Sequence, residues 1–196
     1  MVDKTNNKKI DPLKIIEKYY DKESVTFKYL VTHSKKVTSK ALKIANNLVK
    51  NHNLILDLKF IEEAAMLHDI GVKFCDVPSI GCNGREKYIK HGVLGSRLLK
   101  KEGLLKHAFV CERHIGTGLT KEEIIKNGFS LPKKNTLPIS IEEKIICLAD
   151  CFYSKKPELV NKELSLEQIR ERLKKNGSAS VDRFNKLLKE LSYNKK

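Results

Sequence analysis

The spacing of apolar residues between Ser24 and about Lys50 constrains the fold more than any other feature of the sequence. Apolar side chains recur there every three to four residues, at Phe27, Leu30, Val31, Val37, Ala41, Leu42, Ile44, Ala45 and Leu48. This period predicts a long amphipathic helix with one face in a core. Similar spacing recurs along most of the chain, whereas strand signals are weak and no β-α-β order is present. The sequence therefore predicts an all-α fold, a single-domain helical bundle.

Local start and stop signals divide the chain into further helices. Asp11-Pro12 predicts an N-cap and first helical residue, and Asp57 is a candidate cap for a helix that Gly71 would end as its C-cap. Three capping boxes follow, at Thr120 with Glu123, Ser140 with Glu143 and Ser165 with Gln168. The segment from Val72 to Arg85 is expected to be a loop, and two charged helices at about 165–175 and 179–191 are expected to end the fold.

The chain carries a net charge of +15, from 39 Lys plus Arg against 24 Asp plus Glu. This surplus favours anionic partners such as a nucleotide or another small phosphorylated compound. Nucleic acid is disfavoured as the main partner, because the lysines are scattered and aromatic residues are only 7% of the chain. The five cysteines form no CxxC pair, and no segment resembles a signal peptide or a membrane span. We therefore expect reduced structural thiols, no membrane association and a cytoplasmic location.

The stretch Leu67-His68-Asp69-Ile70-Gly71 closes the predicted helix before the loop and places an imidazole and a carboxylate beside an apolar stripe. Burying such groups without a partner is costly, and a metal ion is a partner that would satisfy both. Four further residues sit on inward-facing helical positions or at helix ends: His33, His91, His114 and Asp150. Imidazoles and carboxylates drawn from separate helices suit a borderline divalent metal in the core of a bundle.

The order His33, His68-Asp69, His91, His114 and Asp150 resembles the HD-domain superfamily of metal-dependent phosphohydrolases. The tetrapeptide His68-Asp69-Ile70-Gly71 reads as the signature of one large subset, and the size is similar to that of its small stand-alone members. The contexts around the other ligands also resemble it: 29–33, 91–96, 113–116 and 148–150.

The resemblance implies a site for two divalent transition-metal ions, of Fe, Mn, Zn, Ni or Co. It assigns one ion to His33, His68, Asp69 and Asp150, and a second to His91 and His114 with Asp69 as the bridge. The implied enzyme is a phosphomonoesterase or phosphodiesterase acting on a nucleotide or small phosphate ester through a metal-activated water.

His68, Asp69 and Lys73 are the expected catalytic residues, and Lys73 with Arg113 the expected substrate-binding residues. Many relatives place a lysine directly after the glycine of the signature, whereas Val72 intervenes here. The expected layout is a disordered basic N-terminus (1–10), the metal-binding domain (11–156) and a C-terminal helical extension packed on it (157–196). The sequence does not decide between a monomer and a homodimer.

Two other readings compete with the hydrolase. The same four histidines and two aspartates occur in HD-fold di-iron oxygenases, in which bound iron would mean oxygen chemistry. A non-catalytic nucleotide-binding module is the third reading, although such modules usually lose ligands and none is missing here.

Overall fold

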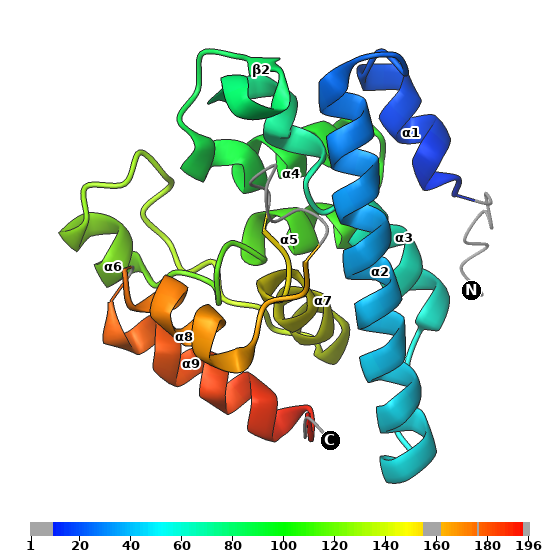
Figure 1. Ribbon diagram of the computed structural model, residues 1–196, viewed down its shortest axis with the longest axis vertical. Coiled ribbons are helices and arrows are strands. Elements are labelled where there is room, and N and C mark those ends of the chain that lie inside the picture. Colours follow the sequence, from blue (N-terminus) through cyan, green and yellow to red (C-terminus); the bar gives the residue numbers. More distant parts are fainter. Residues whose placement is uncertain (1–9, 155–161, 176, 194–196) are drawn as a thin grey trace, which may run out of the picture.

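The computed structural model describes residues 10–154, 162–175 and 177–193. These residues form nine α-helices, three short 3-10 helices and one antiparallel hairpin whose two strands have two residues each (Figure 1). The predicted all-α bundle is therefore confirmed. The helices are α1 (Pro12–Tyr19), α2 (Val25–His52), α3 (Leu58–Leu67), α4 (His91–Lys101), α5 (Leu105–Arg113), α6 (Lys121–Lys126), α7 (Ile141–Cys151), α8 (Leu166–Lys174) and α9 (Ser178–Glu190).

The expected loop between Val72 and Arg85 has structure of its own. It contains most of the 3-10 helix η1 (Ile70–Phe74), strand β1 (Asp76–Val77), the 3-10 helix η2 (Pro78–Ile80) and strand β2 (Cys82–Asn83). The third 3-10 helix, η3 (Tyr88–Lys90), leads into α4. Strands of two residues leave no alternating pattern in a sequence, so the hairpin could not be predicted.

Most of the predicted caps are confirmed. The Asp11 carboxylate accepts a hydrogen bond from the Lys14 amide, Asp57 does the same for Phe60, and the boxes at Thr120 and Ser165 are complete. The Ser140 box forms only in part, because the Glu143 carboxylate accepts from the amide of Ile139 and from a nearby arginine. These side chains satisfy amides that have no partner inside the first turn of a helix.

The prediction that Gly71 is a helix C-cap is wrong. Helix α3 ends at Leu67 with His68 as its C-cap, and Gly71 lies inside η1 without a positive φ. A methyl group added at Gly71 would lie 2.1 Å from the carbonyl oxygen of His91 and 2.3 Å from the amide nitrogen of Gly95. Glycine is needed here because η1 and α4 pack backbone against backbone.

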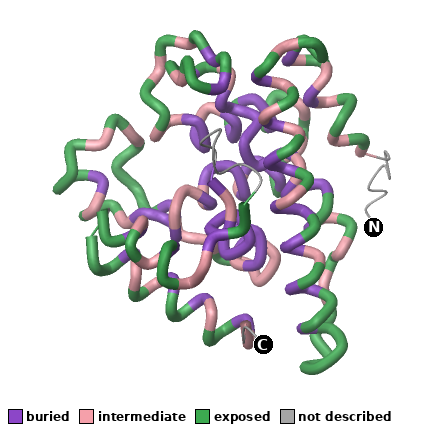
Figure 2. The backbone as a smooth tube through the Cα atoms, in the orientation of Figure 1, coloured by how far each residue is buried: buried purple, intermediate pink, exposed green. Residues whose placement is uncertain are grey.

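The core has two hydrophobic clusters. The first joins α2, α3 and α7 to the C-terminal helices through Ile169, Leu173, Phe184 and Leu187. The second joins α1, η1, the hairpin, α4 and α5. In Figure 2 the buried residues are concentrated where α2, α4, α5 and α7 meet. None of the described helices combines the length and apolarity needed to cross a bilayer.

The domain layout expected from the sequence falls partly on residues outside the described chain. The predicted N-terminal segment 1–10 is described only at Ile10, and the boundary at 156/157 lies within the segment 155–161 that is not described.

Candidate metal centre

Six helical elements bring six buried polar side chains to one place. His33 comes from α2, the adjacent pair His68-Asp69 from the junction of α3 with η1, and Asp150 from the last turn of α7. The remaining two are His91, the first residue of α4, and His114, the C-cap of α5. None of the six exposes more than 8% of its surface. The set of ligands named by the resemblance therefore lies together in space.

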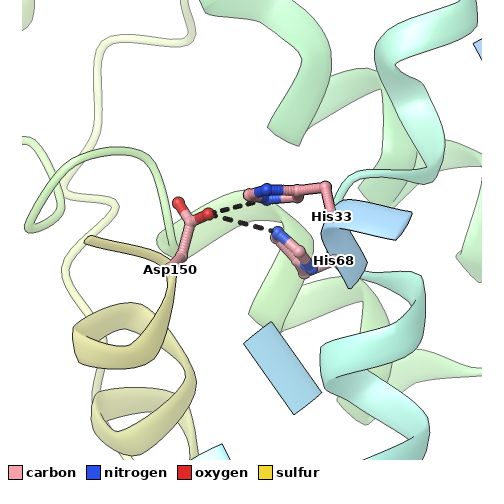
Figure 3. A group of neighbouring side chains, drawn as sticks. All are labelled: His33, His68 and Asp150. Carbon is pink, nitrogen blue, oxygen red and sulfur yellow. Dashed lines mark hydrogen bonds and ion pairs between the residues drawn. The ribbon is translucent and has the colours of Figure 1, made fainter. Parts of the chain in front are cut away.

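In the first group, the imidazoles of His33 and His68 face the Asp150 carboxylate (Figure 3). Its Oδ1 atom lies 3.0 Å from Nε2 of His33 and 3.5 Å from Nε2 of His68. The same two nitrogen atoms each lie 3.4 Å from Oδ2 of Asp69. Two imidazole nitrogens and two carboxylate oxygens thus face one another at ligand spacing.

The second group forms around the other oxygen of Asp69. Oδ1 lies 3.2 Å from Nε2 of His91 and 3.2 Å from Nε2 of His114. The two imidazole nitrogens are themselves only 3.0 Å apart. Asp69 therefore directs one oxygen into each group, which is the arrangement that a bridging carboxylate requires.

Backbone contacts fix the orientation of three of these imidazoles. Nδ1 of His68 lies 2.6 Å from the carbonyl oxygen of Ala65, and Nδ1 of His91 and of His114 lie 2.6 and 2.8 Å from the carbonyls three residues before them. A carbonyl oxygen only accepts, so Nδ1 is the protonated nitrogen of each ring in these contacts. The lone pair is then on Nε2, which faces the cluster, as in metal-ligating histidines.

This donor set fits a divalent cation. With both protons on Nδ1, the Nε2 lone pairs of His91 and His114 face each other at 3.0 Å, and neither can donate to the other. Burial lowers the pKa of His114 to about 4, so this imidazole is neutral near pH 7. A cation between the nitrogens and Asp69 would remove the repulsion and balance the buried carboxylate. Two sets of three residues, His33-His68-Asp150 and His68-Asp69-His114, each have ligand atoms within 4.8 Å of one another.

Lys73 and Arg113, the expected substrate-binding residues, are engaged elsewhere. The Lys73 ammonium group donates to the carbonyl of Tyr19 and lies near three aromatic rings. The Arg113 guanidinium group pairs with Glu143 at 2.7 Å. The structure therefore gives both side chains structural partners on α1 and α7.

Two features beside the ligands were missed in the sequence. The Tyr88 ring stacks on His91 with centroids 4.5 Å apart, and the spacing of three residues was a signal that could have revealed this pair. Gly92 allows α4 to approach α5, since an added methyl group would lie 2.4 Å from the carbonyl of Cys111. No sequence period signals such a close approach.

The other two histidines lie away from the cluster. His52 is exposed at the end of α2, and His107 is buried and pairs with Glu63 at 3.3 Å. The His107 ring also packs edge-on against Phe60 on α3.

Comparison with known proteins agrees with the geometry. The family model described as HD domain matches residues 30–154. A protein of unknown function from Methanocaldococcus jannaschii is 38% identical over 133 residues, which cover 66% of this chain and 70% of the relative. No solved structure matches the chain significantly.

Two further relatives are longer proteins. Each is named tRNA (cytidine(56)-2'-O)-methyltransferase, one from Thermoplasma volcanium and one from Picrophilus torridus, and each is 33% identical to this chain. The matches cover 84% and 69% of this chain but only 42% and 35% of the relatives. The chain thus spans less than half of either methyltransferase.

Proposed function

The chain belongs to the HD-domain family, and we propose that it is a divalent-metal-dependent phosphohydrolase acting on a nucleotide or a small phosphate ester. The observation that carries the proposal is the position of Asp69 between two groups of ligands. One carboxylate oxygen faces His33 and His68, and the other faces His91 and His114. A site built for one ion would need only one of these groups.

Two divalent ions bound there would supply Lewis-acid polarisation of a phosphoryl oxygen and a bound water of lowered pKa. The protein residues supply the geometry. Asp69 and Asp150 hold the negative charge of the site, while the imidazoles direct their Nε2 atoms inward. The contacts from Nδ1 to backbone carbonyls keep His68, His91 and His114 in the tautomer that a ligand needs.

Charge supports an anionic substrate. Two divalent ions with Asp69 and Asp150 leave the site at about +2, and the rest of the chain adds a basic surplus. Substrate phosphate would therefore complete the charge balance. In this proposal Lys73 and Arg113 have a structural role, since both are bound to other protein groups.

A second candidate substrate is a phosphate ester carried by tRNA. The relatives named as tRNA methyltransferases contain a region similar to this chain, and the net charge of +15 suits a polyanion. This candidate keeps the same metal chemistry and changes only what carries the phosphate.

A metal and phosphate-release screen tests the proposal. The protein is loaded with Mn²⁺, Co²⁺, Fe²⁺, Ni²⁺ or Zn²⁺ and offered nucleotides, sugar phosphates, dinucleoside polyphosphates and tRNA. We expect phosphate release by the wild type and by Asp76→Ala, which changes an exposed carboxylate on β1, and none by Asp69→Ala. Turnover by Asp69→Ala would contradict the proposal, and substrate-dependent oxygen uptake by the iron-loaded protein would favour the oxygenase instead.

A further inference from the structure

Two arginines of the C-terminal helices bind backbone carbonyls beside the metal-ligand positions. The first is Arg172 on α8, whose Nη2 donates to the carbonyl of Cys151 at 2.6 Å and whose Nη1 donates to that of Tyr153 at 3.2 Å. Cys151 directly follows Asp150 at the end of α7. Carbonyls in the last turn of a helix have no intrahelical partner, so this guanidinium group completes the end of α7.

The second is Arg183 on α9, which contacts the turn that follows His114. Its Nη2 donates to the carbonyl of Gly118 at 3.0 Å and pairs with Glu123 at 2.9 Å. On the same turn, the buried Thr117 hydroxyl donates to the carbonyl of Ser180 at 3.1 Å. Helix α9 thus holds this turn at two adjacent residues.

The two backbone segments that these arginines bind, the end of α7 and the turn after His114, are also joined to each other. The thiols of Cys147 and Cys151 on α7 donate to the carbonyl of Gly116 at 3.5 and 3.2 Å. The end of α7 and the turn after His114 therefore lie against each other, and α8 and α9 pack on α7 through the first hydrophobic cluster (Figure 1).

We propose that Arg172 and Arg183 are positioning residues of the metal centre, and this rests on the metal binding proposed above. Arg172 fixes the helix end that presents Asp150 to the first group. Arg183 fixes the turn that follows His114 and so positions His114 in the second group. Both lie beyond residue 154, where the match to the family ends, so the C-terminal helices complete the site of this chain. The planar guanidinium group of arginine suits this role because it places several donors in a fixed fork.

Cobalt titration tests the two assignments separately. Binding of Co²⁺ to the metal-free protein is followed by its visible absorption, and the two steps are assigned with Asp150→Ala and His91→Ala, each of which removes a ligand of one group only. The arginine variants are Arg172→Gln and Arg183→Gln. The matched control is Arg170→Gln, because Arg170 on α8 binds Asn185 on α9 and contacts neither backbone segment.

We expect Arg172→Gln to raise the Kd of the step that Asp150→Ala affects by about 10- to 100-fold, the range typical of changes behind a ligand, and to leave the other step unchanged. Arg183→Gln should do the reverse, and Arg170→Gln should change neither. Arg172→Lys and Arg183→Lys keep a charge and donors, so they should restore part of the affinity. Where a glutamine variant does not fold, the lysine variant at the same position is titrated in its place.

Three outcomes would overturn the inference: folded variants that bind both ions as the wild type does, equal weakening of both steps in each variant, or a similar loss in Arg170→Gln. Failure of the wild type to bind Co²⁺ would instead refute the metal centre itself. That result is obtained before any arginine is changed.

Discussion

The substitution Gly71→Ala tests the packing that brings Asp69 and His91 together. The new Cβ would lie 2.1 Å from the carbonyl oxygen of His91 and 2.3 Å from the amide nitrogen of Gly95, and both are backbone atoms. Contact distances of about 3.5 Å require η1 and α4 to separate by about 1.4 Å at the closer of these two atoms. Overpacking of this kind costs about 1–3 kcal/mol, or more where backbone must move. The melting temperature should therefore fall by roughly 2–12 °C for a chain of this length.

The same movement should weaken the second ligand group. Asp69 precedes η1 and His91 begins α4, so separating the two elements lengthens the 3.2 Å contact between Asp69 Oδ1 and His91 Nε2. A displacement of about 1 Å in a site can cost about 100-fold in rate. Thermal melts of the metal-free protein and Co²⁺ titration measure the two effects.

The sign of the stability change makes the test decisive. Where space allows, alanine in place of a helical glycine with negative φ stabilises a fold by about 0.4–1 kcal/mol. Gly103→Ala is the control for strain without crowding: its Cβ would meet nothing within 4 Å, so its positive φ of 77° should cost stability while Co²⁺ binding stays unchanged. A Gly71→Ala protein as stable as the wild type would refute the reasoning about close backbone packing.

Three further predictions follow from other contacts. Asp69→Ala should remove both metal ions, because the carboxylate faces both ligand groups, and metal analysis of the purified variant measures this. His107 is buried beside Glu63, and desolvation lowers its pKa, so it is neutral in the fold but takes up a proton on unfolding below about pH 6.5. Stability should therefore fall as the pH drops below that value, and urea unfolding of His107→Gln should show a weaker dependence on pH. Lys73→Ala should lower the free energy of unfolding by about 1 kcal/mol through lost contacts with Tyr19 and leave KM unchanged, whereas a raised KM would show that Lys73 also meets the substrate.

Helix positions could be predicted from the sequence because their signals are local. An N-cap such as Asp57 and a box such as Thr120 with Glu123 depend on residues three apart, and both are present as predicted. The Ser140 box was predicted by the same rule and forms only in part. Its Glu143 is drawn to Arg113 from a different helix, and no local rule reveals that competition.

The set of candidate ligands could also be predicted, but for a different reason. A buried imidazole or carboxylate needs a partner, so His68 and Asp69 beside an apolar stripe are conspicuous in the sequence. The partners of Lys73 and Arg113 could not be predicted, because many polar groups can bind a lysine or an arginine side chain. A carbonyl of Tyr19 and a carboxylate of Glu143 are their partners in the structure.

Gly71 and Arg172 show why groups that hold the backbone near the candidate ligands escape sequence rules. A glycine that ends a helix and a glycine that lets two backbones touch look the same in a sequence, although only the first needs a positive φ. Gly71 is of the second kind, and the atoms that require it belong to residues 91 and 95. Arg172 likewise binds main-chain carbonyls, which every residue possesses, so no side chain near Asp150 marks its partner. Candidate ligands can therefore be predicted from their chemistry, whereas the groups that set their positions become visible only when the chain is folded.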